Sequence, residues 1–90
     1  MRIRWTEFAA RDLTSICDYI QEHDGLDRAQ KTALRIYEGI AVLVQFPHRG
    51  RRGRKLGTRE LVLLGTPFVV IHRIREDVIE ITRILHGAQK

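Results

Sequence analysis

The last third of the chain carries the side chains best suited to chemistry on a phosphate group. Arg73 and Arg83 can each grip a phosphate oxygen, and His86 follows the last predicted strand, where its side chain can reach over the end of a sheet. His72 can lie opposite Glu80 on neighbouring strands, as a tuned general base or as a structural cross-strand pair. A nuclease built from such residues would be metal-independent and would use Arg, Lys and His around the phosphate. The plainer alternative is that the two arginines extend from sheet edges into solvent.

A second candidate for function is the segment RGRRGRKLGTRE, residues 49–60. The rest of the chain holds ten basic and ten acidic residues, so the whole net charge of +5 arises in this segment. Clustered positive charge accelerates the encounter with a polyanion and supplies salt-sensitive affinity without sequence specificity. The segment is therefore a nucleic-acid grip, a docking surface for an acidic partner, or a solvated loop. Its basic residues are Arg49, Arg51, Arg52, Arg54, Lys55 and Arg59.

Several kinds of site are missing from the sequence. No Cys/His spacing matches a zinc site, and no GxxxxGK[ST] motif is present. No pair of carboxylates is placed for general acid–base catalysis. We therefore expect neither a metal nor a cofactor.

The elements that must position these residues follow from hydrophobic periodicity. Residues 2–5 alternate as a short strand, and Thr6 can cap a helix that ends at Gly25. Asp27 can cap a second helix, with Gln30 completing a capping-box-like pair, and Pro47 stops it. Residues 47–58 read as a glycine-containing loop, and three strands follow. The predicted strands span residues 61–64, 68–74 and 78–85.

This order of elements predicts an α+β fold with the layout β-α-α-β-β-β. The expected architecture is a two-layer sandwich in which a helical hairpin packs on one face of a curled antiparallel sheet. If residues 75–77 form the last turn, Ile74 pairs with Val78 and His72 lies opposite Glu80. The other face of the sheet would then be partly apolar, as in an interaction protein.

Length and composition bound the remaining possibilities. Ninety residues are enough for one domain, which we expect to span residues 1–90. Cys17 is the one cysteine, so the chain cannot form an internal disulfide. The N-terminus lacks an apolar signal region, and no apolar run reaches the length of a membrane span. These features predict a soluble, cytoplasmic protein.

The order and spacing of several short motifs resemble one known family, the RelE/ParE superfamily of bacterial toxins from type II toxin–antitoxin (plasmid-stabilisation) modules. The resemblance runs nearly from end to end and implies the layout given above. The matching residues are Trp5, Ala9/Ala10-x-Asp12-Leu13-x-x-Ile16, Phe46-Pro47, Arg51/Arg52-Gly53, Gly57 to Val62, Pro67 to Val70, Arg73-Ile74, Ile79 to Ile81 and Arg83 to Gly87.

The branch of the superfamily decides the expected activity. In the RelE-type branch, which cleaves ribosome-bound mRNA, the strand corresponding to residues 67–69 usually begins Gly-Tyr-Arg. Here these residues are Pro67-Phe68-Val69, and past the last strand His86 is followed by Gly-Ala-Gln rather than by the usual basic residue or tyrosine. These departures make the chain similar to the ParE-type branch, which poisons DNA gyrase and has no catalytic residues of its own.

Three hypotheses for function follow from this resemblance. The first is a toxin that inhibits DNA gyrase by binding. The alternative is a ribosome-dependent, metal-independent mRNA endoribonuclease that uses Arg59, Arg73, Arg83 and His86. The third is an interaction module that has lost its toxicity.

The resemblance also implies a partner, a cognate antitoxin that forms a hetero-oligomer with the toxin. An acidic, amphipathic segment that folds on binding would suit a partly apolar sheet face beside a basic loop. Arg49, Arg51, Arg52, Arg54 and Lys55 would dock either this antitoxin or the target. We expect Arg59, where the chain enters the sheet, to have a fixed position.

Overall fold

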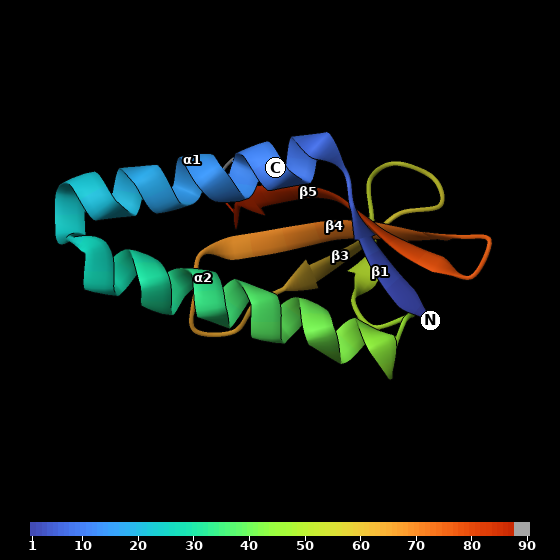
Figure 1. Cartoon of the computed structure of the whole chain (residues 1–90). Coiled ribbons are helices and arrows are strands. Elements are labelled where there is room, and N and C mark those ends of the chain that lie inside the picture. The colour runs from blue at the N-terminus through green and yellow to red at the C-terminus, as the bar shows by residue number, and fades with distance from the viewer. Residues whose placement is uncertain (88–90) are drawn as a thin grey trace.

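Two helices pack against one face of a five-stranded sheet in the computed structural model, which describes residues 1–87 (Figure 1). The predicted α+β layout is confirmed. Residues 88–90 of the expected domain lie outside the described residues. The elements are β1 (Arg2–Trp5), α1 (Glu7–Asp24), α2 (Leu26–Ala41), the short 3₁₀ helix η1 (Val42–Val44), β2 (Arg51–Arg52), β3 (Arg59–Val62), β4 (Phe68–Arg75) and β5 (Val78–His86).

The strands lie in the order β1-β5-β4-β3-β2. The predicted antiparallel meander of the last three strands is confirmed by the pairing of β3 with β4 and of β4 with β5. The first strand joins this meander parallel to β5, so the sheet is mixed rather than antiparallel throughout. The chain can make this parallel contact because the two helices supply the long crossover between the strands.

The predicted loop of residues 47–58 was wrong in one respect, because it contains strand β2. Arg51 and Arg52 pair with Glu60 and Arg59, which makes the basic segment a β-hairpin at the sheet edge. The strand turns in through Gly50, whose φ of 103° favours glycine. A Cβ at this position would stand 2.8 Å from the Glu60 carbonyl oxygen, so β2 can approach β3 only with glycine here.

The predicted register of the last hairpin was also wrong. The turn contains two residues rather than three, because Glu76 and Asp77 both adopt positive φ, as a tight two-residue hairpin turn requires. Arg75 therefore pairs with Val78, and Arg73 rather than His72 lies opposite Glu80. A bulge beside His72 then shifts the register for the rest of the hairpin.

The helices begin and end at recognisable signals. The Thr6 hydroxyl accepts a hydrogen bond from the Ala9 amide at 3.1 Å, which confirms the predicted cap of α1, and Gly25 ends that helix with a φ of 96°. The predicted cap of the second helix was wrong. Gly25 itself precedes α2, whereas Asp27 lies inside the first turn and pairs with Lys31. In residues 1–87 no helix combines the length and the apolar character needed to cross a bilayer.

The core lies between the helical hairpin and the facing side of the sheet. Ile36 and Leu43 enter it from the helical side, and Val70, Ile79 and Ile81 enter it from the two central strands. All five side chains are completely buried. This packing fixes the direction of every strand residue, because neighbours along a strand point to opposite faces.

Candidate functional site

Arg73 lies on the sheet face that the helices leave open, in a row of three charged side chains. Its Nε donates to the Glu80 carboxylate at 2.6 Å, and Arg4 donates to the other oxygen of the same carboxylate. The register explains the row, because Arg4 and Arg73 flank Glu80 on the two strands beside it. The Glu80 side chain is only 8% exposed, whereas those of Arg4 and Arg73 are 59% and 36% exposed.

The electrostatics of Glu80 follow from this geometry. The hydrogen bond from Arg73 and then that from Arg4 lower the pKa of the Glu80 carboxyl, and these effects outweigh burial, which acts to raise the pKa. The carboxylate is thus held ionised between two guanidinium groups. The predicted pair of His72 with Glu80 is absent, so Glu80 tunes no histidine.

Arg83 is held near the end of β5 by Asp12 of α1. Its guanidinium donates twice to the Asp12 carboxylate, at 2.7 and 3.0 Å, and the Ile84 amide donates to the same carboxylate at 2.9 Å. The hydrogen bond from Asp12 raises the pKa of Arg83. This part of β5 extends beyond the end of its pairing with β1. Asp12 therefore satisfies an amide that the short strand β1 does not reach, and it joins α1 to the sheet.

His86 ends β5 at the edge of a groove between the helical hairpin and the sheet. Its ring meets the Phe68 ring edge-on, with 5.9 Å between centroids. The groove has a volume of about 920 Å³, and Ile16, Ile20 and Arg28 contribute to its helical side. Asp12, Asp24 and Arg83 line the same groove, so it combines apolar contacts with charged groups that could hold a polar ligand or a partner.

The basic segment divides into fixed and free side chains. Arg59 has the fixed position that we expected, since it donates to the Gly50 carbonyl oxygen at 3.2 Å. Arg51 pairs with the buried carboxylate of Glu60 at 3.2 Å, and Arg49 lies over the Phe46 ring. Within the described part of the chain, three basic side chains of the segment form no ion pair, no hydrogen bond and no ring contact. These are Arg52, Arg54 and Lys55.

His72 is completely buried beside the base of this segment. Its Nε2 lies 3.1 Å from the Arg49 carbonyl oxygen, whereas its Nδ1 is buried without a hydrogen-bond partner. Burial is the largest effect on the His72 side chain and lowers its pKa, and the charges of Arg59 and His48 act in the same direction. The hydrogen bond to Arg49 opposes them. His72 is therefore a neutral group that fastens the basic segment to the core.

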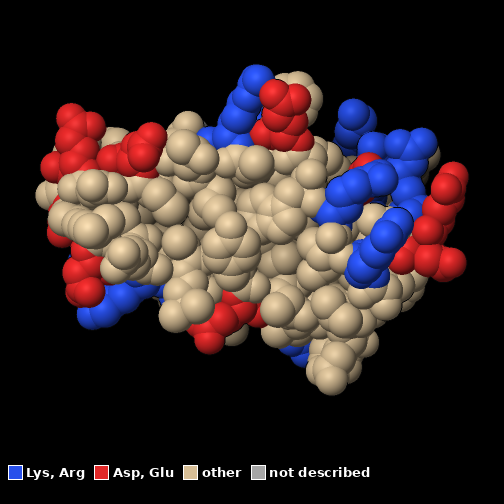
Figure 2. All heavy atoms as spheres, viewed as in Figure 1, with Lys and Arg blue, Asp and Glu red and all other residues tan. Residues whose placement is uncertain are grey.

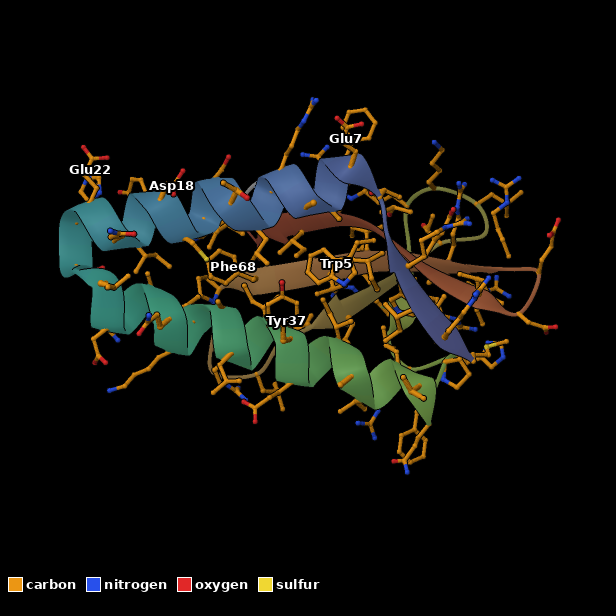
Figure 3. All side chains as sticks on the ribbon, viewed as in Figure 1. Trp5, Glu7, Asp18, Glu22, Tyr37 and Phe68 are labelled. Carbon is orange, nitrogen blue, oxygen red and sulfur yellow. The ribbon has the colours of Figure 1, made fainter. Side chains whose placement is uncertain are left out.

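Charge is distributed unevenly over the two ends of the molecule. Figure 2 shows acidic side chains gathered where α1 meets α2, and most of the visible Lys and Arg side chains at the opposite end. Asp18 and Glu22 point outward from α1, whereas Trp5, Tyr37 and Phe68 lie between the two helices (Figure 3). The Trp5 and Tyr37 rings are 5.4 Å apart between centroids. The basic end is therefore formed by strands and the acidic end by helices.

Of the four candidate catalytic side chains, Arg83 and His86 line the same groove, whereas Arg59 and Arg73 lie outside it. Arg73 faces the open side of the sheet, Arg83 turns to α1, and Arg59 turns to the base of the β2–β3 hairpin. His86 pairs with Phe68, five residues along β4 from Arg73, which corresponds to about 16 Å. Among residues 1–87, no group of three or more His, Cys, Asp or Glu side chains could hold a metal ion.

Sequence reasoning missed three arginines of the open face, namely Arg2, Arg4 and Arg75. A signal was present, because Arg2 and Arg4 alternate within a predicted strand, and Arg73 and Arg75 are likewise two residues apart, although Arg75 was assigned to the predicted turn. Residues two apart in a strand share a face. The wrong register of the last hairpin separated these two pairs and hid the common face.

Comparisons with known proteins agree with one another. The family model described as the ParE toxin of type II toxin-antitoxin system, parDE, matches residues 3–90. Y4kP of Sinorhizobium fredii, a protein named as a toxin, is 42% identical over 99% of this chain and 91% of its own length. Toxin RelE2 of Caulobacter vibrioides is 36% identical over 98% of this chain and 97% of its own length.

Solved structures show the same relationship. A chain of the chromosomal ParDE TA system from P. aeruginosa aligns with a TM-score of 0.88 and 33% identity, over 96% of this chain and 95% of that one. The E. coli DinJ–YafQ complex contains a chain that aligns with a TM-score of 0.64 at 11% identity, over 99% of this chain and 97% of that one. At this low identity, the second likeness shows a shared fold alone.

Proposed function

The chain belongs to the ParE toxin family of type II toxin–antitoxin systems, and we propose that it stops growth by binding and poisoning DNA gyrase. Poisoning by binding requires a surface that fits the target and no catalytic residues. The gyrase target comes from the ParE-type branch that the sequence resembles. The proposal treats the protein as a binding toxin rather than as an enzyme.

The observation that carries this proposal is the separation of the candidate catalytic side chains. Cleavage of RNA without a metal needs a base, an acid and a cation within hydrogen-bonding reach of one phosphate. Arg73 is instead bonded to Glu80 of β5, whereas Arg83 is bonded to Asp12 of α1. His86 shares its groove with Arg83 alone of this set, and the Arg83 guanidinium is already engaged by the Asp12 carboxylate. This arrangement supports binding and disfavours cleavage.

A second candidate function is ribosome-dependent cleavage of mRNA. It is favoured by the 36% identity to a Caulobacter protein named Toxin RelE2, since the RelE-type branch cleaves ribosome-bound mRNA. In that case Arg59, Arg73, Arg83 and His86 would have to be brought together on the ribosome. His86, which is exposed at the end of β5, would be the first residue to test.

The experiment that separates the two functions is induced expression without an antitoxin. Gyrase poisoning predicts altered plasmid supercoiling and a DNA-damage response with intact mRNA. Cleavage predicts the opposite result. His86→Gln sharpens the comparison, because it should abolish toxicity by cleavage and leave toxicity by gyrase binding unchanged. Normal growth of the expressing cells would contradict both functions and favour an interaction module that is not toxic.

We further propose that a cognate antitoxin neutralises the toxin by laying an amphipathic segment into the groove beside His86. The groove offers apolar contacts from Ile16 and Ile20, and Arg28 at its rim can receive a carboxylate of an acidic segment. Deletion of the C-terminal half of the antitoxin should then abolish the complex, as measured by calorimetry. Tight binding by the N-terminal half alone would contradict this assignment.

A further inference from the structure

The open face of the sheet carries an ordered set of arginines, which we call the arginine face and define as Arg2, Arg4, Arg51, Arg73 and Arg75. The register places Arg2 and Arg75 on either side of Val78, and Arg4 and Arg73 on either side of Glu80. Arg51 lies beside Glu60 at the far edge of the same face. Two rows of residues thus cross β1, β5 and β4, and each row has an arginine at both ends. Arg51 of β2 adds a fifth guanidinium group.

The spacing of the two rows follows from the geometry of a sheet. Residues two apart on one strand are separated by about 6.6 Å, and strands two apart by about 9.6 Å. The four arginines of β1 and β4 therefore originate at the corners of a rectangle of these dimensions. Duplex DNA carries one charge per about 1.7 Å of its axis, so several phosphates can lie within reach of such a rectangle.

Two buried carboxylates hold part of this face in place. Glu80 accepts from both Arg4 and Arg73, and Glu60 accepts from Arg51 at 3.2 Å. Arg73 uses its Nε in this bond, which leaves its terminal nitrogens free to donate to a ligand. Preordered arginines lose less side-chain entropy when they bind.

The charge of the face exceeds what its carboxylates neutralise. Five guanidinium groups stand over two buried glutamates, and within the described residues Arg2 and Arg75 are exposed and form no ion pair. The free side chains of Arg52, Arg54 and Lys55 extend the positive charge along the neighbouring hairpin. Glu76 and Asp77 lie beyond Arg75, in the turn at the end of β4.

The uncharged residues of the face favour a duplex over a single strand. The register places Val62, Val69, Ile71, Val78 and Leu85 there, and no described residue of this face is aromatic. Proteins that bind single strands stack bases on aromatic side chains, whereas contacts to a duplex backbone need only cations. An acidic peptide would also be attracted, but a regular array of guanidinium groups suits repeated phosphates better.

We propose that the arginine face binds the phosphate backbone of duplex DNA without reading its sequence. This inference rests on the proposed function, because gyrase holds duplex DNA and a toxin bound to gyrase would therefore lie close to that DNA. The toxin would then contact both the enzyme and its DNA, with the arginine face turned to the phosphates. The contact is electrostatic and weakens as salt releases the bound counterions.

The test is a titration of the full-length protein with a fluorescently labelled DNA duplex, without gyrase, at several salt concentrations. The double variant Arg2→Gln with Arg75→Gln removes two guanidinium groups that form no ion pair with any residue of 1–87. We expect at least a tenfold weaker affinity at low salt. The slope of log affinity against log salt should become shallower by about 0.9 for each phosphate that the variant no longer neutralises.

The matched control is Arg11→Gln with Lys31→Gln, which removes the same charge from the exposed surfaces of α1 and α2. We expect this variant to bind the duplex like the unchanged protein. Equal weakening in both double variants would overturn the proposal, because net charge alone would then explain binding. Tighter binding of a single-stranded RNA of equal length, or of an acidic peptide, would also overturn it.

The outcome is separable from that of the proposed function. DNA binding is read without gyrase, whereas poisoning is read as gyrase-dependent DNA cleavage. Loss of duplex binding together with reduced poisoning in the Arg2 and Arg75 variant is the expected result. Duplex binding with no poisoning by the unchanged protein would contradict the gyrase function and leave the DNA-binding face established. Full poisoning by the variant would contradict a role for the face in that function.

Discussion

Acidic side chains are exposed where the two helices meet, whereas at the other end of the molecule two of them are buried beneath arginines. Asp18, Glu22 and Asp27 extend into solvent from α1 and α2, and Asp27 forms an exposed pair with Lys31. Glu60 and Glu80 are each less than 9% exposed, and each accepts from arginines of neighbouring strands. Carboxylates are thus hydrated at the end where the helices meet, whereas at the other end two buried carboxylates fix the positions of arginine side chains.

The difference between the two ends shows what a carboxylate contributes in each place. An exposed ion pair adds little to stability, because water and salt screen it. A buried carboxylate between two guanidinium groups restricts their orientation, so it acts on geometry as much as on stability. The end of the molecule where α1 meets α2 (the hairpin end) is therefore stabilised by apolar packing. The opposite end, formed by the strands (the sheet end), is stabilised in addition by buried ion pairs, and their arginines form part of the arginine face.

The largest expected effect tests the apolar packing of the hairpin. Ile36→Ala removes a side chain that is completely buried between α2 and the sheet, and should cost about 2–5 kcal/mol of unfolding free energy. Urea unfolding at low and high salt measures this loss, which should not depend on salt. Leu34→Ala on the exposed side of the same helix, where Leu34 is 59% exposed, is the control and should change little. A similar loss in both variants would show that packing is not what holds the hairpin.

The next effect tests the buried carboxylate of the sheet end. Glu80→Gln should lower the urea midpoint at neutral pH by less than Ile36→Ala does, because Arg4 and Arg73 are partly exposed and can be rehydrated. The arginines lower the pKa of Glu80 in the folded protein, so its contribution is fully present above the unfolded pKa of about 4.3. That contribution is lost as the pH falls through the depressed folded pKa.

Acid titration of the urea midpoint therefore separates two glutamates of one hairpin. The slope of stability against pH below about 4.3 should be shallower in Glu80→Gln than in the unchanged protein. Glu76→Gln, in the exposed turn of the same hairpin, should keep the original slope. An unchanged slope in Glu80→Gln would mean that the carboxylate is not held by its arginines.

The layout of the fold could be predicted from the sequence because its signals are local. Thr6 and Gly25 mark the ends of α1 through their own backbone preferences, and hydrophobic period separates helices from strands. The register of the last hairpin could not be predicted in this way. It depends on whether Glu76 and Asp77 both adopt positive φ. Asp tolerates this conformation but Glu rarely adopts it, so the pairing of the strands decides the turn.

The candidate site depended on that register, which is why it was only partly predictable. Shifting the partner of Glu80 from His72 to Arg73 replaces an apparent acid–base pair with an ion pair. The fixed position of Arg59 followed from its place at the start of β3. The contact of His72 with Arg49 joins residues 23 apart in sequence, and no local pattern marks it.

A smaller effect compares the buried histidine at the sheet end with an exposed one on α1. Burial lowers the pKa of His72 in the folded protein, so the unfolded chain takes up a proton at higher pH than the folded one. Stability is therefore fully present above about pH 6.5 and falls as the pH drops below it. In His72→Gln this slope should disappear. His23→Gln on the exposed surface of α1 is the control and should retain it, and loss of the slope there instead would contradict the role of His72.

The smallest effect tests the exposed charges of the hairpin end. The Asp27 and Lys31 side chains are 82% and 75% exposed, and their 3.1 Å pair spans one helical turn. Lys31→Gln keeps the helix propensity nearly unchanged, so the loss should be only about 0.3–0.5 kcal/mol in low salt and should vanish at high salt. Urea unfolding at two salt concentrations measures the loss. Arg28→Gln is the control, because Arg28 forms no ion pair with the residues that the structure describes. If the loss of stability persisted at high salt, the Asp27–Lys31 pair would have to be shielded from solvent, like the pairs of the sheet end. That result would contradict the difference between the two ends.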